Sequence, residues 1–495
     1  MRDAYKALSD KGFAEPDVDD VALPGDSYVD FAFKDKVPAG LFLGNVAVVV
    51  YLAVVWGAPN IGTFDFTQHK SGDEKRSQGM SLLVVAGLMG AVGAVLSALW
   101  LQALHLYAVR IISVTLQATV AALLVGAVAG FMEAGLAGQA IGLGNLFLAV
   151  ALGLYYISVR HRIPFAAANL AVASKIMQRF PQIALTAYAA IAAQVVWTSL
   201  WTVALVGVWV IAYKDGGAME SLPSSTTTHF CVFLMLLSLF WGLQVLRNVV
   251  HCTAAGTVGE WWFSPHPEGA ARRALRRCVT TSFGSICFGS LIVAALAALR
   301  FVLLTAKRRK SRGSVNACLD CLVGALESNL KIFNKYAYVQ VALYGKSLYD
   351  AGLDTMLLFR EKGWTAVVNE SLVSSVLSTG CVVVGLATGL VGVGLVHATT
   401  ACSDAEAHAH EGQCDTFSVL LTTFAICNAV GYAMCAVVSS ILDSIVATVF
   451  VCFAEDPVAL HITNSDEYMG IVDAWRQFHP ELLTHSTFSA SVSYA

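Results

Sequence analysis

The stretch FWGLQVLRNVVHCTAAGTVGEWWF, residues 240–263, combines apolar runs with a stripe of hydrophilic side chains. At 100° per residue, one polar and aromatic set falls within an arc of about 120° of a helix: Trp241, Gln244, Arg247, Asn248 and His251. Leucine and valine lie opposite, where they suit contact with lipid or with other helices. A charged side chain at the bilayer centre costs about 2.5 kcal/mol or more. The stripe therefore predicts a membrane helix whose polar face is turned toward the interior of a bundle.

The composition of the whole chain points to the same class of protein. Of its 495 residues, 57 % are hydrophobic and 13 % are charged, whereas a soluble domain is about 45–50 % apolar and about 25 % charged. Windows of about 20 apolar residues recur, and each is long enough to cross about 30 Å of hydrocarbon as a helix. We therefore predict an all-α, polytopic protein of the lipid bilayer with about ten transmembrane helices and short loops. Nothing in the sequence resembles a nucleic-acid-binding surface.

The apolar windows give nine clear spans: 40–58, 81–104, 108–131, 139–158, 183–212, 228–252, 279–304, 372–398 and 416–453. A weaker tenth, 334–358, is interrupted by Lys335, Lys346 and Asp350. Basic residues mark cytoplasmic loops, and they occur in the loops after the fourth and sixth spans. This pattern predicts that both termini are cytoplasmic, with an N-terminal tail at 1–39, a transmembrane domain at 40–454 and a C-terminal tail at 455–495.

One basic run leaves the path of the chain open. The sequence KRRKSR, 307–312, would lie outside if 279–304 crosses the membrane once. Either 279–304 is a re-entrant hairpin or tilted helix that returns to the cytoplasm, or the basic run is an exception to the positive-inside pattern. The sequence does not decide between these paths.

The fifth span carries a second unusual face. Gln194, Trp197 and Trp201 follow the spacing i, i+3, i+7 and so share a stripe. One interpretation of the two stripes is a passage for a solute. The other is hydrogen bonding between helices, worth about 0.6 kcal/mol per contact, together with packing of the indoles against glycine or alanine. Trp261 and Trp262 stand where the sixth span ends, so we expect them in an aromatic belt at the membrane surface.

Charges within the spans are few. Asp443 and Glu133 could neutralise Arg247 or a cationic solute, although Asp443 could instead lie at the level of the inner headgroups. His251 could carry protons, or it could be a structural histidine with both ring nitrogens bonded. Cys402 and Cys414 flank an acidic loop that we expect outside, where they could form a disulfide in an oxidising compartment.

Motifs for enzymatic chemistry are missing from the sequence. It contains no P-loop, no GxGxxG placed after a strand, no HExxH and no GxSxG. The lone CxxC at Cys318 and Cys321 has no second pair to complete a zinc site. We therefore expect a protein that is not an enzyme and that holds no metal or other cofactor.

Four blocks, in order along nearly the whole chain, resemble the choline transporter-like family (solute carrier family 44). They are RHRIPFA at 160–166 with QVVWTSLW at 194–201, the stretch that ends in QVLRNVVHCTAAGTVGEWWF, NACLDCLVGALESNLKIFNKYAYVQVALYGKSLYDA at 316–351, and ILDSIVATVFVCFAEDP at 441–457. The loop at 59–80 is short, whereas animal members carry a large domain there, and YGKSLYDA lacks a cysteine of those members. The chain is thus more similar to the fungal and protist branch.

The resemblance implies about ten spans, cytoplasmic termini and transport of choline or a related amino alcohol, with the plasma membrane as the expected location. Choline's trimethylammonium group is recognised by aromatic faces, at about 0.5–2 kcal/mol each. The candidate walls of such a cage are Trp197, Trp201, Trp241 and Tyr338, and the candidate partners of the hydroxyl are Gln194, Gln244 and Asn248. Two alternatives remain: a carrier or channel for another solute, and a non-transporting membrane scaffold or lipid-interacting protein.

Overall fold

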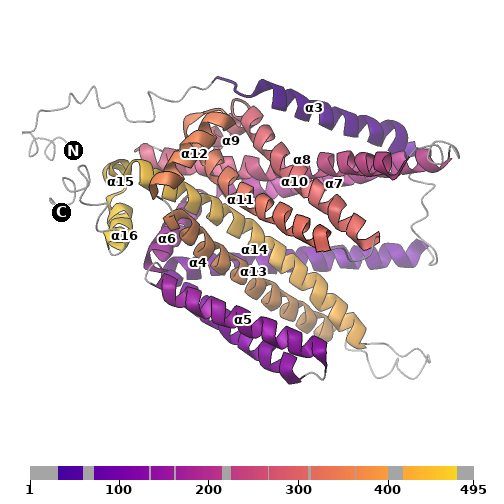
Figure 1. Cartoon of the computed structure of the whole chain (residues 1–495), viewed down its shortest axis with the longest axis horizontal. Coiled ribbons are helices and arrows are strands. Elements are labelled where there is room, and N and C mark those ends of the chain that lie inside the picture. Colours follow the sequence, from indigo (N-terminus) through magenta and orange to yellow (C-terminus); the bar gives the residue numbers. More distant parts are fainter. Residues whose placement is uncertain are drawn as a thin grey trace, which may run out of the picture.

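The computed structural model describes residues 32–59, 72–132, 135–160, 163–214, 224–265, 267–309, 314–362, 364–399 and 416–476, and every regular element in these ranges is helical. The first is α3 (Lys36–Tyr51), which continues into a π-helical segment, η1 (Leu52–Gly57). The other long helices are α4 (Gly72–Met132), α5 (Leu136–Val159), α7 (Gln182–Lys214), α8 (Ser224–Phe263), α10 (Phe283–Arg309), α11 (Ser314–Tyr344), α13 (Trp364–Thr399) and α14 (Thr416–Glu455). Shorter helices gather at one end of the bundle (Figure 1): α6 (Ile163–Arg179), α9 (Ala270–Val279), α12 (Leu348–Lys362), α15 (Pro457–Thr463) and α16 (Ser465–Arg476).

Eight helical stretches of the described part are long and apolar enough to cross a membrane. They are Lys36–Gly57, Leu106–Met132, Gly138–Ser158, Gln182–Val208, Phe233–Phe263, Phe283–Val302, Leu372–Leu395 and Leu421–Glu455. Leu421–Glu455 is the most enclosed, since 83 % of its most apolar window is buried inside the protein. These findings confirm the all-α, polytopic membrane architecture predicted from the apolar windows.

Helix α4 contains two of the predicted spans, 81–104 and 108–131, which meet at a kink. Tyr107 stands between them with non-helical torsion angles, φ −129° and ψ 24°. The helix packs along α5, α13 and α14. The approach to α14 is close, because a Cβ on Gly93 would lie 3.2 Å from the Cα of Gly431. Two glycines thus let the backbones of these helices come together, as small residues do in membrane bundles.

The weak predicted span 334–358 is wrong. The chain leaves α11 after Tyr344, turns at Gly345 with φ 63°, and begins α12 at Leu348. The apolar window 334–358 covered both the end of α11 and the start of α12. The long helix in this region is α11, whose hydrophilic residues kept it below the hydropathy expected of a span. Helix α10 is one uninterrupted helix and not a hairpin, and it runs from the end that holds α9 to the opposite end of the bundle (Figure 1).

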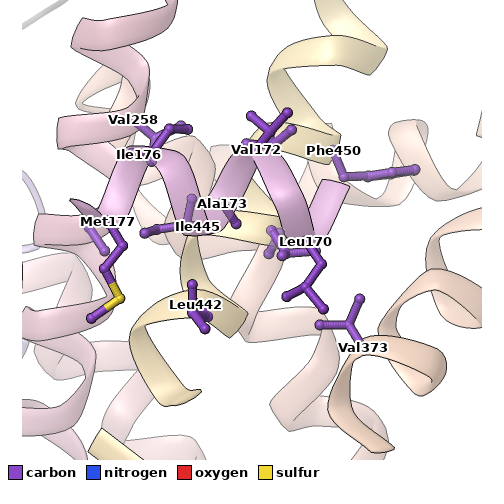
Figure 2. Packing of buried hydrophobic residues seen from close by; sticks show 14 of the residues in the cluster. Leu170, Val172, Ala173, Ile176, Met177, Val258, Val373, Leu442, Ile445 and Phe450 are labelled. Atoms are coloured by element: carbon purple, nitrogen blue, oxygen red, sulfur yellow. The ribbon is translucent and has the colours of Figure 1, made fainter. Parts of the chain in front are cut away.

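Helix α6 closes the end of the bundle at which the short helices gather. Leu170 and Ile176 are buried to within 1 % of complete burial, in contact with side chains of α8, α13 and α14 (Figure 2). Burying one such side chain contributes about 1.5–3 kcal/mol. Lys175 of α6 also forms an ion pair with Glu467 of α16. Apolar packing and this ion pair thus tie α6 and the C-terminal helices to one end of the long helices.

The two tryptophans at the end of α8 do not form an aromatic belt, which corrects that expectation. Trp261 and Trp262 are 2 % and 0 % exposed, and their rings pack edge to face with centroids 6.2 Å apart. The indole Nε1 of Trp262 donates a hydrogen bond to the carbonyl oxygen of Asp456 at 2.9 Å. The C-terminal helices α15 and α16 follow this point and cover a surface that hydropathy alone assigned to the membrane boundary.

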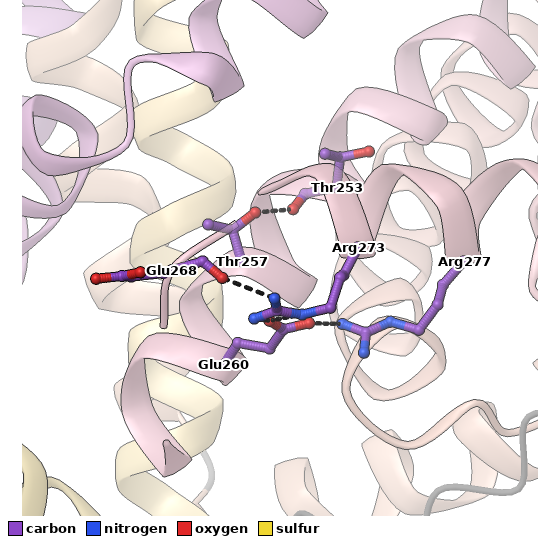
Figure 3. Close-up of polar contacts among 6 residues, drawn as sticks. All are labelled: Thr253, Thr257, Glu260, Glu268, Arg273 and Arg277. Atoms are coloured by element: carbon purple, nitrogen blue, oxygen red, sulfur yellow. Dashed lines mark hydrogen bonds and ion pairs between the residues drawn. The ribbon is translucent and has the colours of Figure 1, made fainter. Parts of the chain in front are cut away.

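A charged cluster fastens α9 to the end of α8. The Glu260 carboxylate accepts hydrogen bonds from Arg273 Nε at 2.9 Å, Arg273 Nη2 at 2.6 Å and Arg277 Nη2 at 2.5 Å (Figure 3). Arg273 Nη1 also donates to the carbonyl oxygen of Glu268 at 2.6 Å. Such bidentate, charge-assisted bonds fix geometry as well as adding stability. Two of the four arginines in this loop are therefore structural.

Candidate functional site

A cavity of about 630 Å³ lies among α7, α8, α10, α11, α13 and α14. This volume is within the range of small-molecule sites, about 300–1,000 Å³. Its polar lining comes from five of the helices: Gln194 of α7; Gln244, Arg247, Asn248 and His251 of α8; Lys331, Asn334, Lys335 and Tyr338 of α11; Ser374 of α13; and Tyr432, Ser440, Asp443 and Ser444 of α14. Ile191, Val293 and Ile332 contribute apolar wall. The cavity thus combines apolar wall with a set of polar and charged side chains.

Three residues give the depth of the cavity. Gln194 lies twelve residues after Gln182, the first residue of α7, while His251 and Asp443 each lie twelve residues before the last residues of α8 and α14. These helix ends all border the short helices α6, α9 and α15. At 1.5 Å per residue, the cavity lies about 18 Å into the bundle. The hydrocarbon layer of a membrane is about 30 Å thick, so a site at this distance from the helix ends lies well inside the bundle.

The structure brings together most of the polar residues that the helical stripes singled out. Gln194 and Gln244 face the cavity from neighbouring helices, and Arg247, Asn248, His251, Tyr338 and Asp443 line it as well. In the described part of the chain, the side-chain amides of Gln194 and Gln244 have no hydrogen-bond partner. They are therefore neutral groups of the wall that remain free to bind a solute.

The three tryptophans of the expected cage lie elsewhere. Their indole Nε1 atoms donate hydrogen bonds to backbone carbonyl oxygens: Trp197 to Leu239 at 3.3 Å, Trp201 to Met235 at 3.1 Å and Trp241 to Cys287 at 3.0 Å. All three side chains are at most 8 % exposed, and none lines the cavity. Their geometry matches the alternative weighed for them, packing against small residues.

Gly242 shows why Trp197 turns away from Gln194 although the two share a stripe. A Cβ on Gly242 would lie 2.2 Å from Trp197 Nε1 and 2.3 Å from its Cε2. Only a glycine leaves room for the indole against α8. The aromatic surface of the cavity consists instead of Tyr338 and Tyr432.

Asn248 and Tyr338 belong to a hydrogen-bonded network that joins α8, α10 and α11. Asn248 Nδ2 donates to Ser290 Oγ at 2.9 Å and to the Tyr338 hydroxyl at 3.3 Å. The Tyr338 hydroxyl donates to the carbonyl oxygen of Ile286 at 3.2 Å. A buried polar group must be bonded, since leaving it unpaired costs about 1–3 kcal/mol. Both side chains therefore hold the wall in shape, besides exposing part of their surface to the cavity.

His251 fastens three helices to one another. Its Nε2 lies 2.8 Å from the carbonyl oxygen of Lys335, and its Nδ1 lies 2.7 Å from Ser444 Oγ. Because a carbonyl oxygen only accepts, the proton of the neutral ring lies on Nε2, and Nδ1 can accept from the serine. Both ring nitrogens are bonded, which agrees with the structural interpretation of this histidine.

The charged residues of α11 were missed as site residues by the sequence analysis. Lys335 Nζ lies 2.7 Å from Asp443 Oδ1, and the two side chains are 12 % and 28 % exposed. Lys331 Nζ lies 2.6 Å from Glu327 Oε1, and Arg300 Nη1 lies 3.4 Å from Glu327 Oε2. A signal was available, because Lys331, Lys335 and Tyr338 recur every three or four residues in KIFNKYAYVQ.

Arg247 has a different environment from these cations. It is exposed, it lines the cavity, and among the described residues it forms no ion pair or hydrogen bond. The partner that we expected for it, Asp443, pairs with Lys335 instead. The other candidate partner, Glu133, lies outside the described residues, as do Cys402 and Cys414 of the expected disulfide.

Comparison with known proteins agrees with the resemblance drawn from the four blocks. Residues 144–458 match the family model of plasma-membrane choline transporters. The chain is 31 % identical over 422 residues to Protein PNS1 of Cryptococcus neoformans var. neoformans serotype D, covering 81 % of this chain and 72 % of the relative. It is 27 % identical over 374 residues to Protein pns1 of Aspergillus fumigatus, covering 68 % of each.

A third relative comes from a protist. The chain is 31 % identical over 264 residues to a CTL-like protein of Dictyostelium discoideum, covering 51 % of this chain and 45 % of the relative. The family match extends from α5 to α15 and so includes every helix that lines the cavity. The chain is therefore a multi-pass integral membrane protein that belongs to the choline transporter-like family.

Proposed function

We propose that the protein transports choline or a related organic cation or amino alcohol across the membrane, through the central cavity and by alternating access. The observation that carries the proposal is a solute-sized cavity well inside the bundle, lined by amides, one carboxylate, three cationic side chains and tyrosines. A bundle that only supports other proteins has no need of unpaired hydrophilic groups at this depth, where each is costly. We further propose the plasma membrane as its location, in keeping with the description of the family.

The recognition of a cation would fall to Asp443 and the two cavity tyrosines. Asp443 is the carboxylate in the lining, and Lys335 neutralises it in this structure. A solute ammonium group would compete with Lys335 for Asp443. Tyr338 is 2 % exposed and so offers the solute only its rim. Tyr432 lies eleven residues from Asp443 on α14, about 16 Å along the helix, so its face would contact a quaternary ammonium group at a separate point of the passage, at about 0.5–2 kcal/mol.

The packing of α14 supports alternating access. Every residue from 441 to 453 except Asp443 is buried, whereas between 421 and 436 only Cys427, Gly431 and Cys435 are buried. The bundle is therefore packed tightly on the side of α6 and α15 and loosely on the other side. We infer a state that is closed toward the cytoplasm and open outward, with both termini and the short helices cytoplasmic.

We also propose that ten helical segments cross the membrane. The first arm of α4 and helix α11 would join the eight apolar stretches. The inward direction of α11 supports its inclusion, since Asn334 and Gln340 are 5 % and 1 % exposed and Glu327 is 7 % exposed. A helix that meets other helices and a wet cavity on most sides can span the bilayer without being apolar throughout.

Uptake of radiolabelled choline by proteoliposomes tests the proposal. We expect Asp443→Asn to lower uptake at least tenfold at equal protein incorporation, because the solute loses its counter-charge. The control is Asp354→Asn, which removes a carboxylate that pairs with Lys346 away from the cavity, and we expect it to leave uptake near the unsubstituted rate. Choline uptake that is undiminished in Asp443→Asn would refute this role for the cavity, and a panel of other amino alcohols and cations in the same vesicles would test the substrate class.

A further inference from the structure

No carboxylate among the described residues compensates the charge of Arg247. Arg247 lies sixteen residues before Phe263, the last residue of α8, which places it about 24 Å into the bundle. Within the described ranges, Lys335 pairs with Asp443, and Lys331 and Arg300 both meet Glu327, whereas Arg247 meets no carboxylate.

The lining of the cavity is consequently basic. Three of its side chains are cationic at neutral pH, Arg247, Lys331 and Lys335, against one carboxylate, Asp443. Assigning Glu327 to Lys331 leaves the charge of Arg247 unbalanced. A lone cation entering this space would be attracted by Asp443 and repelled by Arg247, whereas a solute with charges of both signs would balance the wall.

We propose that Arg247 is the oxyanion subsite of the cavity, and that the preferred solute is a zwitterion in which an ammonium group is joined to a carboxylate or a phosphate. This inference rests on the proposed transport function and extends its substrate class from cations to zwitterions that carry the same ammonium group. The guanidinium group presents a planar fork of donors that matches both kinds of oxyanion. Gln244 lies one turn before Arg247 on the same face of α8, and its free amide can add a further hydrogen bond to the anionic group.

The two ends of the solute would then bind to different helices. Arg247 and Gln244 on α8 hold the anionic end, while Asp443 on α14 holds the ammonium end. The two helices are in contact with each other. A solute held in this way bridges α8 and α14, so its binding is coupled to the relative position of two helices that alternating access must move.

Four probes and the purified protein in lipid nanodiscs test the inference. The probes are choline, which is a cation only; glycine betaine, with the same trimethylammonium group and a carboxylate; phosphocholine, with that group and a phosphate; and acetate, an anion only. Dissociation constants follow from the dependence of thermal stability on probe concentration. We expect at least one zwitterion to bind the unsubstituted protein tenfold more tightly than choline, and acetate to bind more weakly than either. Betaine and phosphocholine distinguish the two oxyanions.

Variants at Arg247 test whether this residue causes the preference for a zwitterion over choline. We expect Arg247→Gln to reduce the ratio of choline to zwitterion dissociation constants to about one, and Arg247→Lys to restore part of it. The control Arg272→Gln removes an exposed arginine of α9 outside the cavity and should keep the full ratio. Choline binding without any preference for a zwitterion in the unsubstituted protein, or a preference that survives Arg247→Gln, overturns the subsite while leaving the proposed transport intact. If no trimethylammonium compound binds or is transported, the proposed function fails.

Discussion

The ion pair between Lys335 and Asp443 offers a quantitative test of the site. Replacing Lys335 by Met leaves the Asp443 carboxylate without its partner, and replacing Asp443 by Leu leaves the ammonium group unpaired. Losing one partner of a buried pair costs about 3–5 kcal/mol. Because the Asp443 side chain is 28 % exposed to the cavity, water can solvate part of its charge. We therefore expect each single substitution to lower the free energy of unfolding by about 2–3 kcal/mol, at or below the lower limit of that range.

The double variant separates the interaction energy of the pair from the cost of losing each charge singly. With both charges gone, neither member of the pair leaves an unpaired charge behind, and apolar replacements of similar volume are often nearly neutral. We expect a total loss of about 1–2 kcal/mol and hence a coupling energy of about 3 kcal/mol, at the upper end for residues in contact. The measurement is reversible unfolding in mixed micelles, with the fraction folded followed against the mole fraction of denaturing detergent.

A matched pair on the surface supplies the control. Lys346 and Asp354 are also joined by a short contact, 2.6 Å, but their side chains are 37 % and 36 % exposed. The same double-variant cycle there should give a coupling energy below about 1 kcal/mol, as exposed ion pairs do. Additive effects of Lys335→Met and Asp443→Leu, or equal coupling in the two pairs, would contradict the placement of the first pair in a low-dielectric cavity wall.

Two further substitutions test the packing around the site. Gly242→Ala should destabilise the protein by about 1–3 kcal/mol, because the new Cβ would lie 2.2 Å from Trp197 Nε1; a stability equal to that of the unsubstituted protein in the same unfolding assay would contradict this contact. Glu260→Gln should cost about 1–2 kcal/mol, toward the low end since Arg273 is half-exposed. It should also make the segment 264–280 more sensitive to limited proteolysis, whereas Glu268→Gln, in which the backbone acceptor of Arg273 is retained, should not.

The candidate site was predictable in part. Gln194, Gln244, Arg247, Asn248 and His251 were found from helical periodicity, and Asp443 from the cost of a charge in hydrocarbon; all of them line the cavity. Tyr338 entered through the family resemblance and also lines it. The three tryptophans were placed by the same periodicity, but a stripe about 120° wide can meet a cavity along one edge and a neighbouring helix along the other. Trp197 and Trp201 meet the neighbouring helix.

The sequence by itself determined the class of the protein and the positions of most of its apolar helices, because hydropathy and the 3.6-residue period are local properties that a chain carries into any fold. Only the tertiary structure decided that α11 is an inner helix, that Lys335 pairs with Asp443, and that Arg247 has no ion-pair partner among the described residues. The physical reason is that the cost of a charge depends on what faces it. In this protein those facing groups come from helices far apart along the chain.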